Sequence, residues 1–294
     1  MVRYSSGDRA FLVFVYAYLA VALLIVLYPL MYILSSSFSH PRAVTAGRVW
    51  LWPVEPSLAG YRAVFQNPQI MTGFANSFFY MTVGTVVNVA MTLAAGFPLS
   101  RKELVGRNAL MLFFVFTMLF SGGLVPLYLV VQTLGLINTR AAMILPAALS
   151  VWNVIITRTY LKVTIPDQLY EAAQLDGCGD LSFFLRVVLP LSGPIIAVNA
   201  LFYGVFHWNS YFNALIFLRD QSLYPLQLVL RSILILNRFS PAYTDSLDSM
   251  LRRQGLTSLL QYSTIVVASV PVMLLYPFVQ RYFVRGIMIG AIKG

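Results

Sequence analysis

The segment from residue 165 to residue 190 holds the residue types best suited to recognition by another protein. Within it, Glu171 is followed by Ala172 and Ala173, and Gly177 lies two turns further on. A carboxylate offers a specific handle to a basic group, and small side chains allow another backbone to come close. This chemistry is that of a helix docked into a groove on a partner protein. The alternative is that the segment packs on the ends of its own apolar stretches.

The same segment predicts two short helices joined by a sharp turn. Asp167 follows a proline and can cap the first helix, which Gly177 can end in the left-handed conformation. Asp180 can cap the second helix, and Pro190 closes it. The apolar residues of this second helix recur at i, i+3, i+4 and i+7, which predicts one apolar stripe. They are Leu181, Phe184, Leu185 and Val188.

A second set of residues could contact a ligand from within an apolar stretch. Its members are spaced by 4, 3, 4 and 3 residues, which predicts one face of a helix. They are Asn199, Tyr203, Phe206, Ser210 and Asn213. Such groups should not face lipid, so they either bond neighbouring helices or line an aqueous cavity. Aromatic rings and amides suit a sugar, and both interpretations stay open. Asn76, Tyr80 and Asn88 form a similar but weaker set.

Nothing in the chain predicts catalysis. The two histidines, His40 and His207, belong to no HExxH motif, and the apolar stretches hold no paired carboxylates. We therefore expect no enzyme activity, metal or cofactor. A phosphate-binding loop needs a lysine directly after glycine, and none of the three lysines has one. ATP and Mg²⁺ would have to be bound by a separate subunit. The single cysteine excludes an internal disulfide.

The elements that position these residues are membrane helices. Hydrophobic residues make up 59% of the 294 and charged residues 10%, against about 25% charged in soluble domains. Mean hydropathy is +0.77. A soluble enzyme, a disordered chain and a coiled coil are excluded, which leaves an all-α integral membrane protein with one domain over 1–294. Long charge-free windows predict six transmembrane helices near 10–35, 72–99, 109–133, 140–162, 192–218 and 257–281.

The charge of the chain fits a membrane rather than nucleic acid. There are 20 basic and 10 acidic residues, and a basic excess is usual in loops beside anionic headgroups. Six spans put both termini on one side, and a slight basic bias favours the cytoplasmic side. Two longer loops, 36–71 and 219–256, then lie outside. The second is basic, and its apolar stretch 223–236 predicts an interfacial helix.

The motif residues of the 165–191 segment resemble the EAA loop, the signature of permease subunits of ABC importers. They are Glu171-Ala172-Ala173, Asp176-Gly177, Phe184, Leu189-Pro190-Leu191 and Pro194. The end of the chain, 280–294, is similar to the tails of carbohydrate permeases of the maltose-transporter type. The resemblance implies the type I ABC importer permease fold in a bacterial inner membrane. It also implies that the loop and both termini are cytoplasmic.

The resemblance carries expectations about residues and partners. The loop would dock on a dimer of ATP-binding subunits through Glu171, Ala172, Ala173, Asp176, Gly177, Phe184 and Pro190. The tail over 282–294 would reach the ATPase through Gly286, Gly290 and Lys293. A second, homologous permease and a periplasmic solute-binding protein would complete the importer. The substrate would be a sugar or oligosaccharide, and an acidic one such as alginate fits the basic loop. An ion-coupled carrier or channel without an ATPase is the alternative, against which the charge-free spans count.

Overall fold

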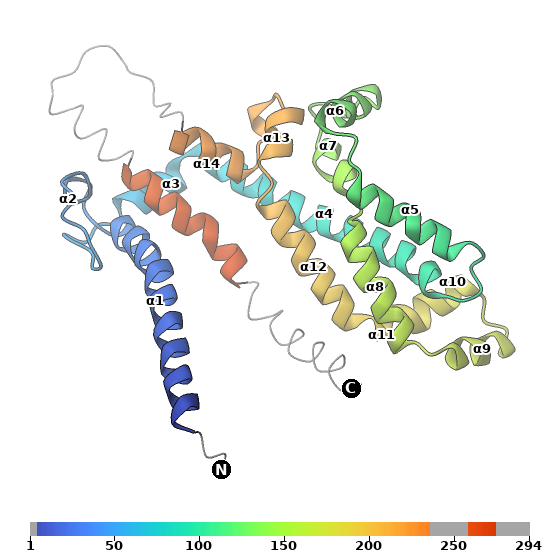
Figure 1. Cartoon of the computed structure of the whole chain (residues 1–294). Helices are drawn as coiled ribbons and strands as arrows, with labels where there is room; N and C mark the ends of the chain where they lie inside the picture. The colour runs from blue at the N-terminus through green and yellow to red at the C-terminus, as the bar shows by residue number, and fades with distance from the viewer. Residues whose placement is uncertain (1–4, 236–257, 275–294) are drawn as a thin grey trace. The chain divides into compact units, whose positions relative to one another are not determined.

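The computed structural model describes residues 5–235 and 258–274, which are all-helical apart from turns and loops (Figure 1). The helices are α1 (Ser6–Ser37), α2 (Pro41–Thr45), α3 (Ala59–Gln66), α4 (Pro68–Ser100), α5 (Arg107–Leu119), α6 (Leu124–Thr133), α7 (Ala141–Ile144), η1 (Leu145–Ala147), α8 (Val151–Thr164), α9 (Asp167–Leu175), α10 (Asp180–Phe183), η2 (Phe184–Val188), α11 (Leu189–Leu191), α12 (Gly193–Trp208), α13 (Phe212–Phe217), η3 (Gln221–Leu223) and α14 (Leu226–Ile235). A further helix covers Ser258–Leu274. The chain divides into two compact units, 1–71 with 230–270 and 72–229 with 271–294.

Two of the described helices, α1 and α4, are by themselves long and apolar enough to cross a membrane. They match the predicted spans 10–35 and 72–99. None of the most apolar window of α1 is buried in the chain, as expected of a helix that faces lipid or another subunit. The helix over Ser258–Leu274 falls within the predicted span 257–281, whose last residues lie outside the described part of the chain.

Three of the predicted transmembrane helices are bent or interrupted in the structure. The span 109–133 is two helices, α5 and α6, that meet at 112° across Gly122 and Gly123. The span 140–162 is bent by 55° between the α7–η1 pair and α8. The span 192–218 stops at Trp208 and resumes as α13. If each bent pair counts as one span, the described residues offer up to five spans, so the number six stays a prediction.

Within the second unit, polar residues of α4 bond the backbone around η3. Asn76 donates to the carbonyl oxygens of Ser222 (2.6 Å) and Tyr224 (3.1 Å). The Tyr80 hydroxyl donates to the carbonyl of Leu223 (2.8 Å). These side chains therefore bond the backbone around η3, which satisfies carbonyls that no helix ladder would satisfy. The helix α14 follows directly and lies within the predicted 223–236 stretch.

Further along, α4 meets α12 through a close, polar contact. The Nε2 atom of His207 lies 3.3 Å from Oδ1 of Asn88, and the hydroxyls of Thr92 and Tyr203 are 2.7 Å apart. Gly84 makes room for the imidazole, because a Cβ atom there would lie 2.6 Å from Cε1 of His207. The pairing of the two helices thus depends on a missing side chain at residue 84.

Gly84→Ala should destabilise the protein. The added methyl group has to displace the buried His207 ring, which costs about 1–3 kcal/mol. Gly193→Ala is the matched control, because a Cβ at residue 193 meets no atom within 4 Å. Thermal aggregation of detergent-solubilised protein, followed by size exclusion, measures both variants. Equal melting temperatures for the two would contradict this account of the α4–α12 contact.

Candidate docking site

The first half of the 165–191 segment is a helix with the predicted glycine stop. Gly177 has φ +73°, and its N–H donates to the carbonyl of Gln174 (2.9 Å). The N–H of Cys178 donates to the carbonyl of Ala173 (2.9 Å). These two bonds form a Schellman motif that ends α9. The prediction that Asp167 caps this helix is wrong: Pro166 is the N-cap, and Asp167 is the first helical residue.

The second half departs from the prediction more strongly. Gly179, not Asp180, is the N-cap, and the helical run continues through Pro190 to Leu191 before a bend of 79° into α12. Residues 184–188 form a π-helical turn. The wider turn breaks the i, i+3, i+4, i+7 register, so the predicted single stripe is wrong. Leu181 and Leu185 are 70% and 52% exposed, whereas Phe183 and Val188 are buried.

The inner face of the segment packs on the ends of its own spans. A buried cluster joins α4, α8 and the two halves of the segment. Its members are Phe97, Leu161, Ile165, Tyr170, Phe183 and Val188. The packing alternative is therefore correct for this face. We call the segment Asp167–Leu191 the elbow.

A buried arginine holds the elbow to α4. The Arg101 side chain is 7% exposed, and its Nη2 donates to the carbonyl of Ile165 (2.9 Å). Its guanidinium also lies over the rings of Phe97 (6.0 Å) and Tyr170 (5.6 Å). Planar cations stack on aromatic faces, which partly offsets the cost of burial. The sequence analysis missed this residue, although a basic pair directly after a long apolar stretch was a usable signal.

Beside it, an ion pair fixes the start of α9. Nζ of Lys102 lies 2.6 Å from Asp167, and Nη2 of Arg101 lies 3.7 Å from the same carboxylate. The hydrogen bond from Lys102 lowers the pKa of Asp167, and the same bond raises the pKa of Lys102. The Tyr170 hydroxyl donates to Asp180 (2.6 Å), which raises the pKa of the phenol. These contacts tie the start of α9 to the α4–α5 loop and the two halves of the elbow to each other.

The outer face of α9 carries the predicted docking residues. Glu171 and Ala172 are exposed, as are their neighbours Leu169 (38%) and Leu175 (90%). Asp176, Gly177 and Pro190 are exposed too, whereas Ala173 and Phe184 turn partly toward the buried cluster. The elbow thus exposes small, acidic and apolar side chains on one face, while its other face is packed in the buried cluster. The tail residues Gly286, Gly290 and Lys293 lie outside the described residues.

The polar set of the fifth apolar stretch does not share one continuous face. Asn199 donates to Thr157 (2.7 Å), and Tyr203 bonds Thr92 and accepts from the Ser150 N–H (3.0 Å). Both side chains are buried between helices of the second unit. Phe206 is 46% exposed, and Ser210 and Asn213 follow the end of α12. The prediction that these five residues share one helix face is wrong, because the helix ends at Trp208. Their role in substrate passage stays a prediction.

Comparison with known proteins identifies the family, although no protein-family model matches. The chain is 38% identical to the polygalacturonan/rhamnogalacturonan transport system permease protein YtcP of Bacillus subtilis, over 98% of this chain and 99% of that one. It is 30% identical to the inner membrane ABC transporter permease protein YcjP of Escherichia coli, over 95% of each. The chain belongs to the permease subunits of ABC sugar and oligosaccharide importers.

A solved structure agrees with this membership. One chain of a bacterial ABC transporter involved in the import of the acidic polysaccharide alginate aligns with a TM-score of 0.89 and 31% identity. The alignment covers 96% of this permease and all of that chain. The resemblance found in the EAA motif is therefore confirmed as a family relationship. The alternative of an ion-coupled carrier or channel is set aside by it.

Lys102→Met should loosen the first turn of α9 in this permease. The pair depends on a charged carboxylate, so its stabilisation is present above the unfolded pKa of Asp167 and is lost as pH falls through the lowered, folded pKa. Hydrogen exchange of the α9 amides should be faster in the variant near pH 7 and converge with wild type in strong acid. Lys162→Met, at an exposed lysine of α8, should leave the exchange of α9 unchanged. Identical exchange in both variants would show that the pair does not fix α9.

Proposed function

We propose that this permease carries an acidic oligosaccharide into the cytoplasm and is driven by a separate ATPase that docks on the elbow. The observation that carries the proposal is the pairing of an exposed docking face with a buried, ion-paired base on one segment. The exposed face supplies a partner contact. The base connects that contact to several helices at once.

The docking step follows from what the outer face presents. Leu175 is 90% exposed and Leu181 70%, which is a large apolar display for a segment outside the apolar spans. Glu171 stands among them and can pair with a basic residue of the ATPase. Ala172 leaves the helix backbone open to close approach. Leu181 and Leu185 extend the face beyond the residues that the motif supplies.

The coupling step follows from what the inner face touches. The buried cluster contains residues of α4, α8, α9 and the π-helical turn, so a displacement of α9 moves these helices together. The bend of 79° at Ser192 leads directly into α12. Closure of an ATPase pair would thus pull on three helices at one end. Alternating access by rigid-body movement is the mechanism that this connection suits.

The family supports a proposal for the remaining parts of the importer. We propose the type I permease fold, a bacterial inner membrane location, and cytoplasmic elbow and termini. A second homologous permease, a periplasmic solute-binding protein and two ATP-binding subunits would complete the complex. ATP and Mg²⁺ would be bound by the ATPase, and this chain would hydrolyse nothing. The tail residues Gly286, Gly290 and Lys293 would reach toward the ATPase.

The choice of an acidic substrate rests on the relatives. YtcP is named for polygalacturonan and rhamnogalacturonan, and the solved transporter imports alginate. All three polymers carry carboxylates. The basic 219–256 loop is in keeping with such cargo, and of its arginines Arg219 and Arg231 are described. Arg219 is exposed, whereas Arg238, Arg252 and Arg253 lie outside the described residues.

Ala172→Trp should abolish co-purification of the ATPase subunit. An indole on the exposed face of α9 would hold the two backbones apart, which a docking interface of small residues cannot absorb. The expected result is a loss of about 10-fold or more in bound ATPase, with unchanged yield of the permease. Ala46→Trp, at an exposed alanine in the first unit, is the matched control and should retain the ATPase. Undiminished ATPase binding by the Ala172 variant would refute docking on this face.

Cells that express the complete importer should take up labelled oligogalacturonate and not a neutral xylo-oligosaccharide of equal length. Carboxylates raise affinity for a basic entry loop, and added salt should weaken that attraction. Uptake should require ATP and fall to background with Glu171→Lys. Preferential uptake of the neutral oligosaccharide would exclude the acidic substrate while leaving ATPase coupling intact.

A further inference from the structure

We propose that the loop over residues 38–58 is a lipid anchor, which seats Trp50 and Trp52 in the headgroup layer of the membrane beside the end of α1. The inference goes beyond the transport function and does not depend on the substrate or the ATPase. It rests on three features of the first unit. The loop is rigid, it is bonded to the last turn of α1, and it displays large apolar side chains on its surface.

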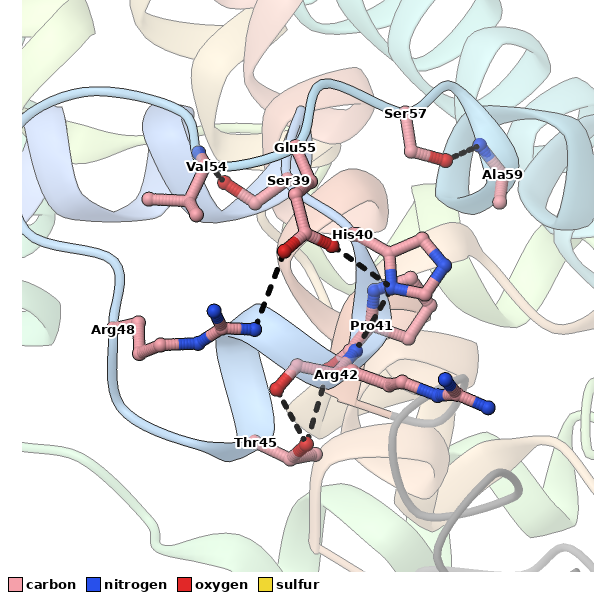
Figure 2. A network of polar contacts seen from close by, with 10 residues as sticks. All are labelled: Ser39, His40, Pro41, Arg42, Thr45, Arg48, Val54, Glu55, Ser57 and Ala59. Carbon is pink, nitrogen blue, oxygen red and sulfur yellow. Dashed lines mark hydrogen bonds and ion pairs between the residues drawn. The ribbon is translucent and has the colours of Figure 1, made fainter.

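The rigidity comes from a polar network drawn in Figure 2. The Glu55 carboxylate lies 3.4 Å from Nη2 of Arg48 and 3.9 Å from Nδ1 of His40. The Ser39 hydroxyl accepts from the Val54 N–H (3.0 Å), and Ser57 accepts from the Ala59 N–H (3.2 Å). Each bond joins the two ends of the loop or closes a local turn. These contacts therefore brace the loop at several points.

Apolar packing fixes the same loop from inside. Ala43 and Val44 of α2 are buried with Val49 against Leu259 of the Ser258–Leu274 helix. Ala43, Val44 and Val49 are the buried apolar residues of this loop, and all three belong to that cluster. The residues that follow Val49 point elsewhere: Trp50 is 68% exposed and Trp52 77%. The stability of the fold does not explain these tryptophans, because side chains that stay exposed add nothing to the core.

The height of the tryptophans is set by α1. The Ser35 hydroxyl donates to the carbonyl of Leu51 (2.5 Å), the residue between the two tryptophans. Asp8 and Arg9 mark one membrane boundary of α1. About 20 residues at 1.5 Å each then cross the hydrocarbon core, and the next turns lie in the opposite interfacial layer. Ser35 falls in that layer, and the bond places Leu51 at the same level.

The chemistry of the patch selects lipid as its occupant. The amphipathic ring of tryptophan is enriched at the headgroup level, where an apolar body and a polar N–H are both satisfied. Leu51 and Leu58, which are 44% and 63% exposed, add aliphatic surface that a saccharide would not need. Membrane contact uses all of these groups, whereas stacking on a sugar uses the rings alone.

A quenching experiment tests the anchor. The single cysteine is first replaced by Cys178→Ser, and a nitrobenzoxadiazole label is then attached at Trp52→Cys in the full-length chain, with the subunits that co-purify. The protein is reconstituted in nanodiscs of phosphatidylethanolamine and phosphatidylglycerol. The lipids carry a nitroxide near the headgroup, and iodide serves as the aqueous quencher. Ala46→Cys, an exposed residue of the same loop outside the apolar patch, is the matched control.

The label at residue 52 should be quenched by the lipid nitroxide at least about two-fold more than the label at residue 46, and iodide should show the reverse order. If Trp52→Cys lowers the yield of folded protein, Leu58→Cys provides a second position with the same expectation. Equal quenching at both positions would overturn the proposal. So would shielding from iodide that depends on adding a solute-binding protein, since the patch would then be a protein interface.

Discussion

The attachment of the elbow to α4 is the contact on which the proposed transport mechanism of this permease depends. Arg101 is nearly buried, and burying a charge costs free energy unless the charge is paired. Its Nη2 bonds the Ile165 carbonyl and lies near Asp167, but no hydrogen-bond partner for its Nε and Nη1 is found among the described residues. The aromatic faces of Phe97 and Tyr170 take their place. Burying Arg101 costs free energy, so this contact serves the precise placement of the elbow more than the stability of the fold.

The two interpretations of the elbow that the sequence left open do not exclude each other. The inner face of the elbow packs against the ends of the permease's own spans, and Tyr170 and Phe183 are buried there. The face proposed for a partner is the opposite one, where Glu171 and Ala172 are exposed. A lever needs both, because a docking face without a firm base would absorb the movement of an ATPase. The Schellman turn at Gly177 keeps the two helices of the elbow at a fixed angle.

Sequence reasoning found the long helices and the glycine stop but not the breaks within apolar stretches. Charge-free windows report how much of the chain avoids water, and α1 and α4 fill theirs with one helix each. They say nothing of backbone direction, so the bend at Gly122–Gly123 was missed although paired glycines were visible. The π-helical turn at 184–188 has no sequence signature of its own, and it ends in a buried Val188 although Leu181 and Leu185 of the predicted stripe are exposed.

The polar residues of the spans show a second limit of periodicity. Spacing by 4 and 3 identifies a common face of a helix, but it does not identify what that face meets. Asn199 and Tyr203 meet Thr157, Thr92 and Ser150, so they serve as bonds between helices of this permease. Oδ1 of Asn199 is buried without a hydrogen-bond partner among the described residues, and a buried acceptor of this kind is costly. A bound water or a movement of α12 against α8 would relieve that cost. Spacing alone therefore cannot tell a bond between helices from the lining of a cavity.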